Sequence, residues 1–235
     1  MATTARSSNR RPTIRRAGPQ SLTDQVYQSL KEDILRTRRA PGDLLLEPEL
    51  AEHYRVSKTP IREALRWLVQ EDWVLTLPRK GYLVRPLRLE DIREVFALRQ
   101  LLEPGLVTEA TGRASRVDLD RLRTHVDIQS RAREHLDDAL LSATGFHLTL
   151  AEMAGNVRAV RILSGLLDEV RRLHYMIPTL ESHITSEAEL DSHRAIIAAL
   201  VANRPDEAAQ LMSDHLTEAG QAMVGVFGGF PTARR

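Results

Sequence analysis

The spacing of apolar residues predicts three helices near the N-terminus of this chain. Along residues 21–36 apolar positions recur every three or four residues, which places them on one face of a helix. A proline favours a second, short helix over residues 48–54, and Ser57 is a typical N-cap for a third helix that runs to residue 71. One side of this third helix is apolar and consists of Ile61, Ala64, Leu65, Leu68 and Val69.

Two short runs of β-branched and aromatic residues follow the third helix, at 73–77 and 82–85. The four residues between them, 78–81, form a typical turn sequence, so the pair is predicted to be a β-hairpin. Three helices followed by a hairpin is the order of a winged helix-turn-helix.

After Pro86 the apolar spacing is helical almost throughout, and we find no convincing strand pattern. Helices are predicted over 90–111, 117–135, 137–154, 157–176, 184–202 and 205–224. The fold class is therefore mainly α: an N-terminal winged helix-turn-helix (three helices plus a β-hairpin wing) followed by an all-helical antiparallel bundle.

The same patterns predict the domain boundaries. We expect a disordered basic tail at 1–19, a winged helix-turn-helix domain at 20–86, a helical domain at 87–227, and a flexible tail at 228–235.

Composition narrows the class of protein. Without cysteine, the chain can form neither disulfides nor thiolate metal sites. No stretch approaches the roughly 20 uncharged residues of a membrane span, and no signal peptide is apparent, so we expect a cytoplasmic protein with no membrane partner. Residues 1–85 carry a net charge of +6 and residues 86–235 carry −5, which favours an anionic partner for the first half.

The third helix carries the candidate DNA contacts. Opposite its apolar side it presents hydroxyl and basic groups, as a helix that enters the major groove requires: Ser57, Lys58, Thr59, Arg62 and Arg66. Arg62 is the best candidate for a guanine edge, and Arg79, Lys80 and Gly81 at the wing tip could reach the minor groove or the backbone. A basic amphipathic helix alone is more often a solvated face.

A longer motif makes the DNA-binding interpretation specific. The segments Gly42-Asp-Leu-Leu-Leu46, Leu50-Ala-Glu-His-Tyr-Arg-Val-Ser-Lys-Thr-Pro-Ile-Arg-Glu-Ala-Leu65, Trp73-Val74 and Arg79-Lys-Gly-Tyr82 resemble the GntR superfamily of bacterial regulators. The resemblance covers about residues 21–85. The sequence departs from the family at Pro48, where relatives often carry an arginine that contacts DNA.

The remaining chain resembles the helical ligand-binding (FCD) domain of the FadR branch of that superfamily. The matching segments are Leu98–Glu103, Phe146-His147, Ala154-Gly-Asn156, Ser192–Ile196 and Ala208–His215. The resemblance implies a bundle that encloses a cavity for a small carboxylate-containing metabolite.

Many members of that branch hold a divalent metal with one aspartate and three histidines. His147, His193 and His215 match the histidines, whereas Ala143 stands where the aspartate is usual. The resemblance thus implies a Zn²⁺ or Ni²⁺ site that the missing carboxylate should weaken. The alternative is a metal-free pocket whose histidines bind the effector directly. The other histidines are interpreted as surface or packing residues: His53, His125, His135, His174 and His183.

Two further residues are candidate effector contacts. Arg99 lies one helical turn before Glu103, so it either grips the effector carboxylate or forms an intrahelical ion pair; the resemblance favours ligand contact. Asn156 could contribute an amide to the pocket, although a capping role is the stronger interpretation.

These features favour a homodimeric, ligand-responsive repressor on double-stranded DNA with a palindromic operator, controlled by a small organic acid. The alternative is a metal-dependent enzyme with an open three-histidine site. Against the enzyme, no motif places a carboxylate or another base beside those histidines. An architectural DNA-binding protein without an effector would leave the helical domain superfluous.

Overall fold

The structure of the protein is a computed structural model that describes residues 21–132 and 135–228. The chain divides between Leu87 and Arg88 into two compact units, one residue after the predicted end of the first domain. The predicted tail at 1–19 and nearly all of the predicted tail at 228–235 lie outside the described residues.

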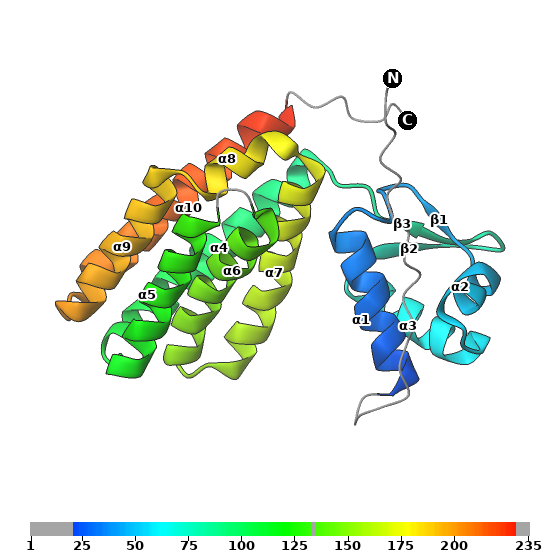
Figure 1. The fold of residues 1–235 in the computed structure, drawn as a ribbon, viewed down its shortest axis with the longest axis horizontal. Helices are drawn as coiled ribbons and strands as arrows, with labels where there is room; N and C mark the ends of the chain where they lie inside the picture. The colour runs from blue at the N-terminus through cyan, green and yellow to red at the C-terminus, as the bar shows by residue number, and fades with distance from the viewer. Residues whose placement is uncertain (1–20, 133–134, 229–235) are drawn as a thin grey trace, which may run out of the picture. The chain divides into compact units, whose positions relative to one another are not determined.

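The N-terminal unit consists of three helices and a small sheet (Figure 1). The helices are α1 (Leu22–Leu35), α2 (Glu47–Tyr54) and α3 (Lys58–Gln70), and the strands are β1 (Leu44–Leu45), β2 (Val74–Leu77) and β3 (Gly81–Val84). The strands are antiparallel in the order β1-β3-β2. The predicted winged helix-turn-helix is confirmed.

Local sequence explains where these helices begin. Ser21 and Asp24 form a reciprocal capping box at the start of α1. Ser57 is the N-cap residue of α3, as predicted, but its side chain makes no capping hydrogen bond. The predicted apolar side of α3 packs against α1, with Ile61 and Leu65 fully buried and Val69 only half-buried.

The sequence pattern missed β1. Two residues are too few to show the alternation of a strand, and Leu44 and Leu45 become a strand only by pairing with Leu83 and Tyr82 of β3. This pairing gives Gly81 a structural role, because a Cβ at Gly81 would lie 2.7 Å from the carbonyl oxygen of Leu45.

The helical unit contains six long helices and a short connecting segment. The long helices are α4 (Leu89–Thr111), α5 (Arg116–Arg131), α6 (Leu136–Met153), α7 (Val157–Met176), α9 (Glu187–Val201) and α10 (Pro205–Gly228). The 3₁₀ turn η1 (Pro178–Leu180) and α8 (Glu181–Ile184) connect α7 to α9. The predicted all-helical bundle is confirmed, with helix ends that differ from prediction by at most four residues.

One of those differences has a clear local cause. The predicted helix at 184–202 begins only at Glu187, because the side chain of Ser186 caps it there. After α6, Gly155 has a φ of +77°, which suits a helix stop, and Asn156 has a negative φ and is the N-cap of α7.

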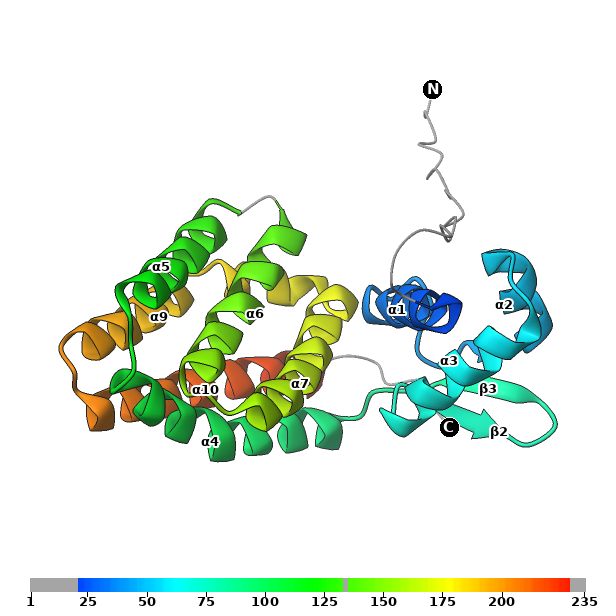
Figure 2. The same cartoon turned by 90° about the horizontal axis from the view of Figure 1, so that it is seen from below.

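The long helices of this unit pack side by side (Figure 2). One buried apolar cluster draws on α4, α5, α6, α9 and α10, and another joins α7 to α4 and α6. Helix α4 lies along α10 and also contacts α6 and α7, while α5 contacts α6 and α9. Residues from α4, α6, α9 and α10 therefore meet in the interior of the unit. Within the described ranges, no helix combines the length and the hydropathy that crossing a bilayer requires.

The close approach at Gly81 generates a stability prediction. Gly81 has a φ of +111° and its Cβ position is blocked by backbone, so Gly81→Ala should destabilise the N-terminal unit by about 2 kcal/mol or more. Both tryptophans, Trp67 and Trp73, lie in this unit, so tryptophan fluorescence during urea unfolding reports on it directly.

The control for this experiment is Gly112→Ala in the helical unit. Gly112 has a φ of −72° and no atom within 4 Å of a Cβ position, so the substitution should leave the fluorescence transition in place. A transition midpoint for Gly81→Ala equal to that of Gly112→Ala would contradict the structural role of Gly81.

Candidate DNA-reading surface and histidine cluster

The predicted DNA contacts on α3 share one exposed side of the helix. Ser57, Lys58, Thr59, Arg62 and Arg66 are all exposed, as are Arg79 and Lys80 of the wing. Gly81 is half-buried at the first position of β3, where its packing against β1 accounts for the glycine.

Two of the arginines on α3 are engaged by carboxylates. Arg62 Nε donates to Glu47 Oε2 of α2 at 2.6 Å, and Arg66 Nη1 donates to Glu63 at 3.1 Å. Both guanidinium groups are well exposed, so these ion pairs are weak and can exchange with other anions. The sequence did not point to Glu47, because its partner lies fifteen residues away on another helix.

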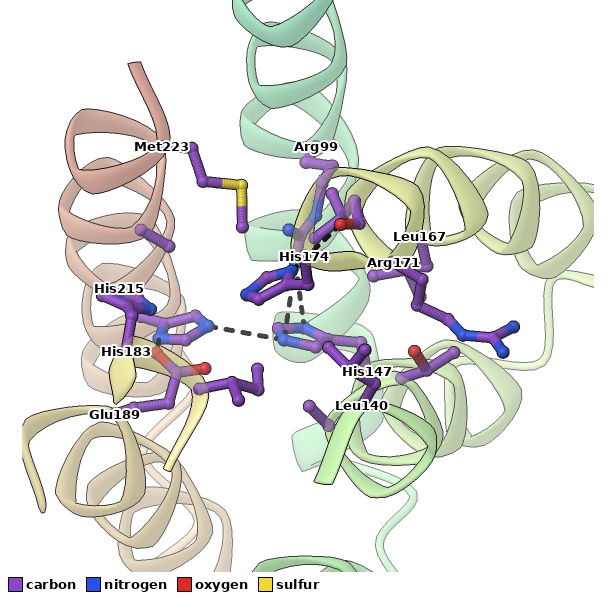
Figure 3. Close-up of a pocket in the computed structure, with 15 residues that line it drawn as sticks. Arg99, Leu140, His147, Leu167, Arg171, His174, His183, Glu189, His215 and Met223 are labelled. Carbon is purple, nitrogen blue, oxygen red and sulfur yellow. Dashed lines mark hydrogen bonds and ion pairs between the residues drawn. The ribbon is translucent and has the colours of Figure 1, made fainter. Parts of the chain in front are cut away.

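Three buried histidines from three helices converge inside the helical unit, and Figure 3 shows two of them, His147 and His215, facing each other. His147 of α6, His193 of α9 and His215 of α10 each offer a ring nitrogen, and these nitrogens lie within 4.8 Å of one another. The Nε2 atoms of His147 and His215 are 3.4 Å apart. The structure thus brings together the three residues that the sequence had grouped.

Hydrogen bonds orient two of the three rings. Nδ1 of His147 bonds Glu103, and Nδ1 of His215 bonds Ser192 Oγ at 3.0 Å. Such contacts on Nδ1 leave the two Nε2 atoms facing each other as the ligand atoms for a metal ion. The partner of His147 is the same Glu103 that forms the ion pair with Arg99.

His193 is held differently. Its ring stacks on Phe146 with centroids 4.0 Å apart, and neither ring nitrogen has a hydrogen-bond partner. Because burial lowers the pKa of His193 and of His215 well below the usual value, both rings are neutral near pH 7. Neutral imidazole is the form that binds metal ions.

Arg99 and Glu103 turn out to form a buried ion pair that also belongs to the site. Both are almost fully buried on α4, Arg99 Nε contacts Glu103, and Arg99 Nη2 lies 3.4 Å from His147 Nε2. Burial by itself would raise the pKa of Glu103, but Arg99 and His147 together lower it to about 2. Glu103 is therefore a permanent anion at neutral pH.

The cluster borders a small cavity with a volume of about 30 Å³, which is room for one or two water-sized groups. Arg99, His147 and His215 line it, and so does Ala143, the position of the missing aspartate. Figure 3 shows that the labelled side chains on its wall come from α4, α6, α7, α9 and α10 and from the segment that contains His183.

Three residues of this cavity were missed or misjudged from sequence. His174 and His183 were interpreted as surface or packing residues, but both line the cavity. Burial lowers the pKa of His174 to about 4, and its Nδ1 bonds the Val170 carbonyl. Glu189 also lines the cavity and puts a carboxylate beside the histidines, which no sequence motif had indicated.

Asn156 does not reach the cavity. Its Oδ1 accepts the backbone N–H groups of Arg158 and Ala159, so it caps α7, and it lines a separate hollow with Glu109 and Arg113. The structure therefore separates Asn156 from the other predicted effector contacts.

Comparison with known proteins assigns both units. Residues 94–218 match the FCD domain family, and residues 22–84 match the family described as bacterial regulatory proteins, gntR family. The chain belongs to the GntR family of transcriptional regulators. Its FCD domain agrees with the FadR branch that the sequence motifs had indicated.

The alignments with curated relatives span most of this chain and most of each relative. The chain is 27% identical over 206 residues to the HTH-type transcriptional repressor RspR of Escherichia coli K12, covering 87% of this chain and 90% of RspR. It is 29% identical to the HTH-type transcriptional repressor NanR of Enterobacter sp. strain 638, covering 91% and 88% of the two chains. These relatives are regulators, so the prediction of a regulator rather than a metal-dependent enzyme is confirmed.

Solved structures share the fold. Escherichia coli McbR/YncC matches with a TM-score of 0.76 at 20% identity, covering 88% of this chain and 99% of that one. A putative GntR regulator from Rhodococcus sp. RHA1 matches with a TM-score of 0.74 at 23% identity, covering 90% of this chain and all of that one.

Proposed function

We propose that this regulator is a homodimeric repressor whose affinity for a palindromic operator is controlled by a small organic acid bound in the histidine-lined cavity, through a divalent metal. The observation that carries the proposal is the presence of both family domains in one chain, with an exposed basic side on α3 and a buried cluster of three histidines in the helical unit. RspR and NanR are named as repressors, which favours that mode of action here.

The proposed DNA contacts are the exposed groups of α3 and the wing. Lys58 and Thr59 lie at the N-terminus of α3, where the helix dipole favours phosphate, and Arg62 is one turn further along. Arg79 and Lys80 occupy the turn between β2 and β3, from which they could reach an adjacent groove.

The proposed dimer surface lies on α4 and α7, which pack beside each other. Leu101 and Ile162 are 78% and 53% exposed. Each shares its helix face with a glycine, Gly105 or Gly165, at which a Cβ would meet no atom within 4 Å. Exposed apolar side chains beside glycines allow close approach of helices from a second copy.

The residues of the cluster fit a divalent metal. Three imidazoles converge, both nitrogens of His193 lack partners, and Glu103 and Ser192 hold the other two rings by Nδ1. When bound, the metal would supply a positive site for an effector carboxylate. Arg99 would add a guanidinium group to the same wall, while Glu103 fixes its Nε.

The cavity is too small for an organic acid as it stands, so effector binding requires the surrounding helices to move. Helix α4 carries Arg99 and Glu103, and only four residues connect its start to the end of β3. A shift of α4 would therefore reach the DNA-binding unit through a short connection and, through Leu101, the dimer surface. A movement of α4 would couple the effector cavity to the DNA-binding surface, provided that the effector binds one conformation of the dimer more tightly than the other.

Loss of the candidate guanine contact should weaken DNA binding. Arg62→Ala is expected to cost about 1–3 kcal/mol of affinity for a duplex selected by the parent protein from a random-sequence library, and less for non-specific DNA. Fluorescence anisotropy at fixed salt measures both. Arg116→Ala, which removes an arginine that is 95% exposed in the helical unit, is the control. Equal affinities of the two variants for the selected duplex would exclude Arg62 as a specificity contact.

A charge on the proposed dimer surface should separate the copies. Leu101→Asp is expected to give a monomer in sedimentation equilibrium, because a carboxylate would be buried against apolar side chains. Val117→Asp alters a comparably exposed residue on α5 (69% exposed) and should remain dimeric. A dimeric Leu101→Asp would place the interface elsewhere, and a monomeric parent would contradict the homodimer.

Removal of one imidazole should remove the metal. Purified, tag-free parent protein is expected to hold close to one divalent metal ion per chain in elemental analysis, and His193→Ala much less. His193 is the preferred variant because its ring makes no hydrogen bond that the substitution would break. His135→Ala, at an exposed position, is the control.

The same samples test the effector. Short-chain hydroxy, keto and dicarboxylic acids that stabilise the metal-loaded parent against heat should release it from the selected duplex, and should do neither with His193→Ala. Parent protein free of metal after incubation with Zn²⁺ or Ni²⁺ would rule out the metal and leave Arg99 and the histidines as direct effector contacts.

A further inference from the structure

The carboxylate of Glu189 is buried without a good partner. Glu189 is 8% exposed near the start of α9, and its side-chain contacts within the described chain are long. Oε1 lies 3.7 Å from His193 Nε2, and Oε2 lies 3.7 Å from His215 Nδ1. A separation of 3.7 Å is too long for a hydrogen bond.

The Glu189 carboxylate faces the imidazoles of His193 and His215, each at 3.7 Å. Arg99 lines the same cavity, but its guanidinium group is paired with Glu103. A buried carboxylate without a close partner is costly to keep charged, and a metal ion held between it and the imidazoles would compensate its charge.

The distances between the ring nitrogens and the Glu189 carboxylate suit ligands of one shared cation better than direct hydrogen bonds. Two ligands of one tetrahedral Zn²⁺, each bound at about 2.0–2.1 Å, lie about 3.4 Å apart. The Nε2 atoms of His147 and His215 are separated by 3.4 Å, and Glu189 Oε1 is 3.7 Å from His193 Nε2. His193 has no partner for either ring nitrogen.

The sequence spacing points the same way. Glu189 precedes His193 by one helical turn on α9, as the usual aspartate position, here Ala143, precedes His147 on α6. Ala143 and Glu189 both line the cavity beside the cluster. A carboxylate that is absent from the α6 side is thus present on the α9 side.

We propose that Glu189 is the fourth protein ligand of the metal site and replaces the carboxylate missing at position 143. The assignment rests on the proposed function, because it requires that the histidine cluster binds a metal. With Glu189 as a ligand, the site has three imidazoles and one carboxylate, the same donor set as one aspartate and three histidines. The metal affinity then need not be lowered by Ala143.

The test is the affinity for Zn²⁺ alone, measured by competition with a chromophoric chelator on the full-length apoprotein. Glu189→Gln is expected to weaken Zn²⁺ binding by at least about 100-fold, more than the roughly 10- to 100-fold loss for a residue that only orients a ligand. Asp191→Asn, which removes a carboxylate with 69% side-chain exposure from the same helix, should bind Zn²⁺ like the parent.

A second variant separates a ligand from a structural residue. Ala143→Asp combined with Glu189→Gln should restore Zn²⁺ affinity to within about 10-fold of the parent, because it returns a carboxylate to the opposite wall of the cavity. Thermal unfolding of the metal-free proteins provides the folding control. Glu189→Gln should unfold close to the parent temperature, since the contacts of its carboxylate with His193 and His215 are 3.7 Å long and the substitution breaks no close one.

The remaining outcomes overturn the assignment in distinguishable ways. Parent-like Zn²⁺ affinity of Glu189→Gln would exclude Glu189 and leave the three-histidine site intact. A loss that Ala143→Asp does not rescue would show that Glu189 acts only through His193 or His215. A parent that binds no Zn²⁺ would refute both this assignment and the metal in the proposed function.

Discussion

The helical unit depends on a buried chain of polar contacts from Arg99 through Glu103 to His147. Burying a guanidinium and a carboxylate costs several kcal/mol for each ion unless each is paired and hydrogen-bonded. Here one carboxylate serves both needs, because its two oxygens contact Arg99 on the preceding turn of α4 and His147 on α6. The chain of contacts fixes the register between the two helices, and it fixes which nitrogen of His147 faces the other histidines.

The sequence predicted what depends on local pattern and missed what depends on packing between distant segments. Helical periodicity and capping residues located the long helices, and a family motif grouped His147, His193 and His215. No periodicity could reveal the two-residue strand β1, which exists only through its partner. Glu189 and His183 were missed for a similar reason: each has an ordinary local sequence, and only the meeting of helices places it on the cavity wall.

Helix α4 takes part in the cavity, in the outer surface and in the connection to the DNA-binding unit. It contributes Arg99 and Glu103 to the interior of the helical unit, exposes Leu101 on the outside, and follows the wing after a connection of four residues. A rigid helix transmits displacement along its length more faithfully than a loop does. In the proposed mechanism, α4 is therefore the element whose displacement would connect the cavity, the outer surface and the DNA-binding unit.

The pairing of Arg62 with Glu47 has a consequence for how the protein samples a genome. When the Arg62 guanidinium binds a DNA phosphate, it gives up its contact with Glu47. The net gain in binding free energy is only the difference between the two contacts, so the protein binds random DNA more weakly than it would with an unpaired arginine. A guanine edge offers two acceptors in a geometry that one carboxylate contact at Nε does not match. If Arg62 reads a guanine as proposed, Glu47 would be an internal competitor that shortens the residence of the protein on the wrong sequence.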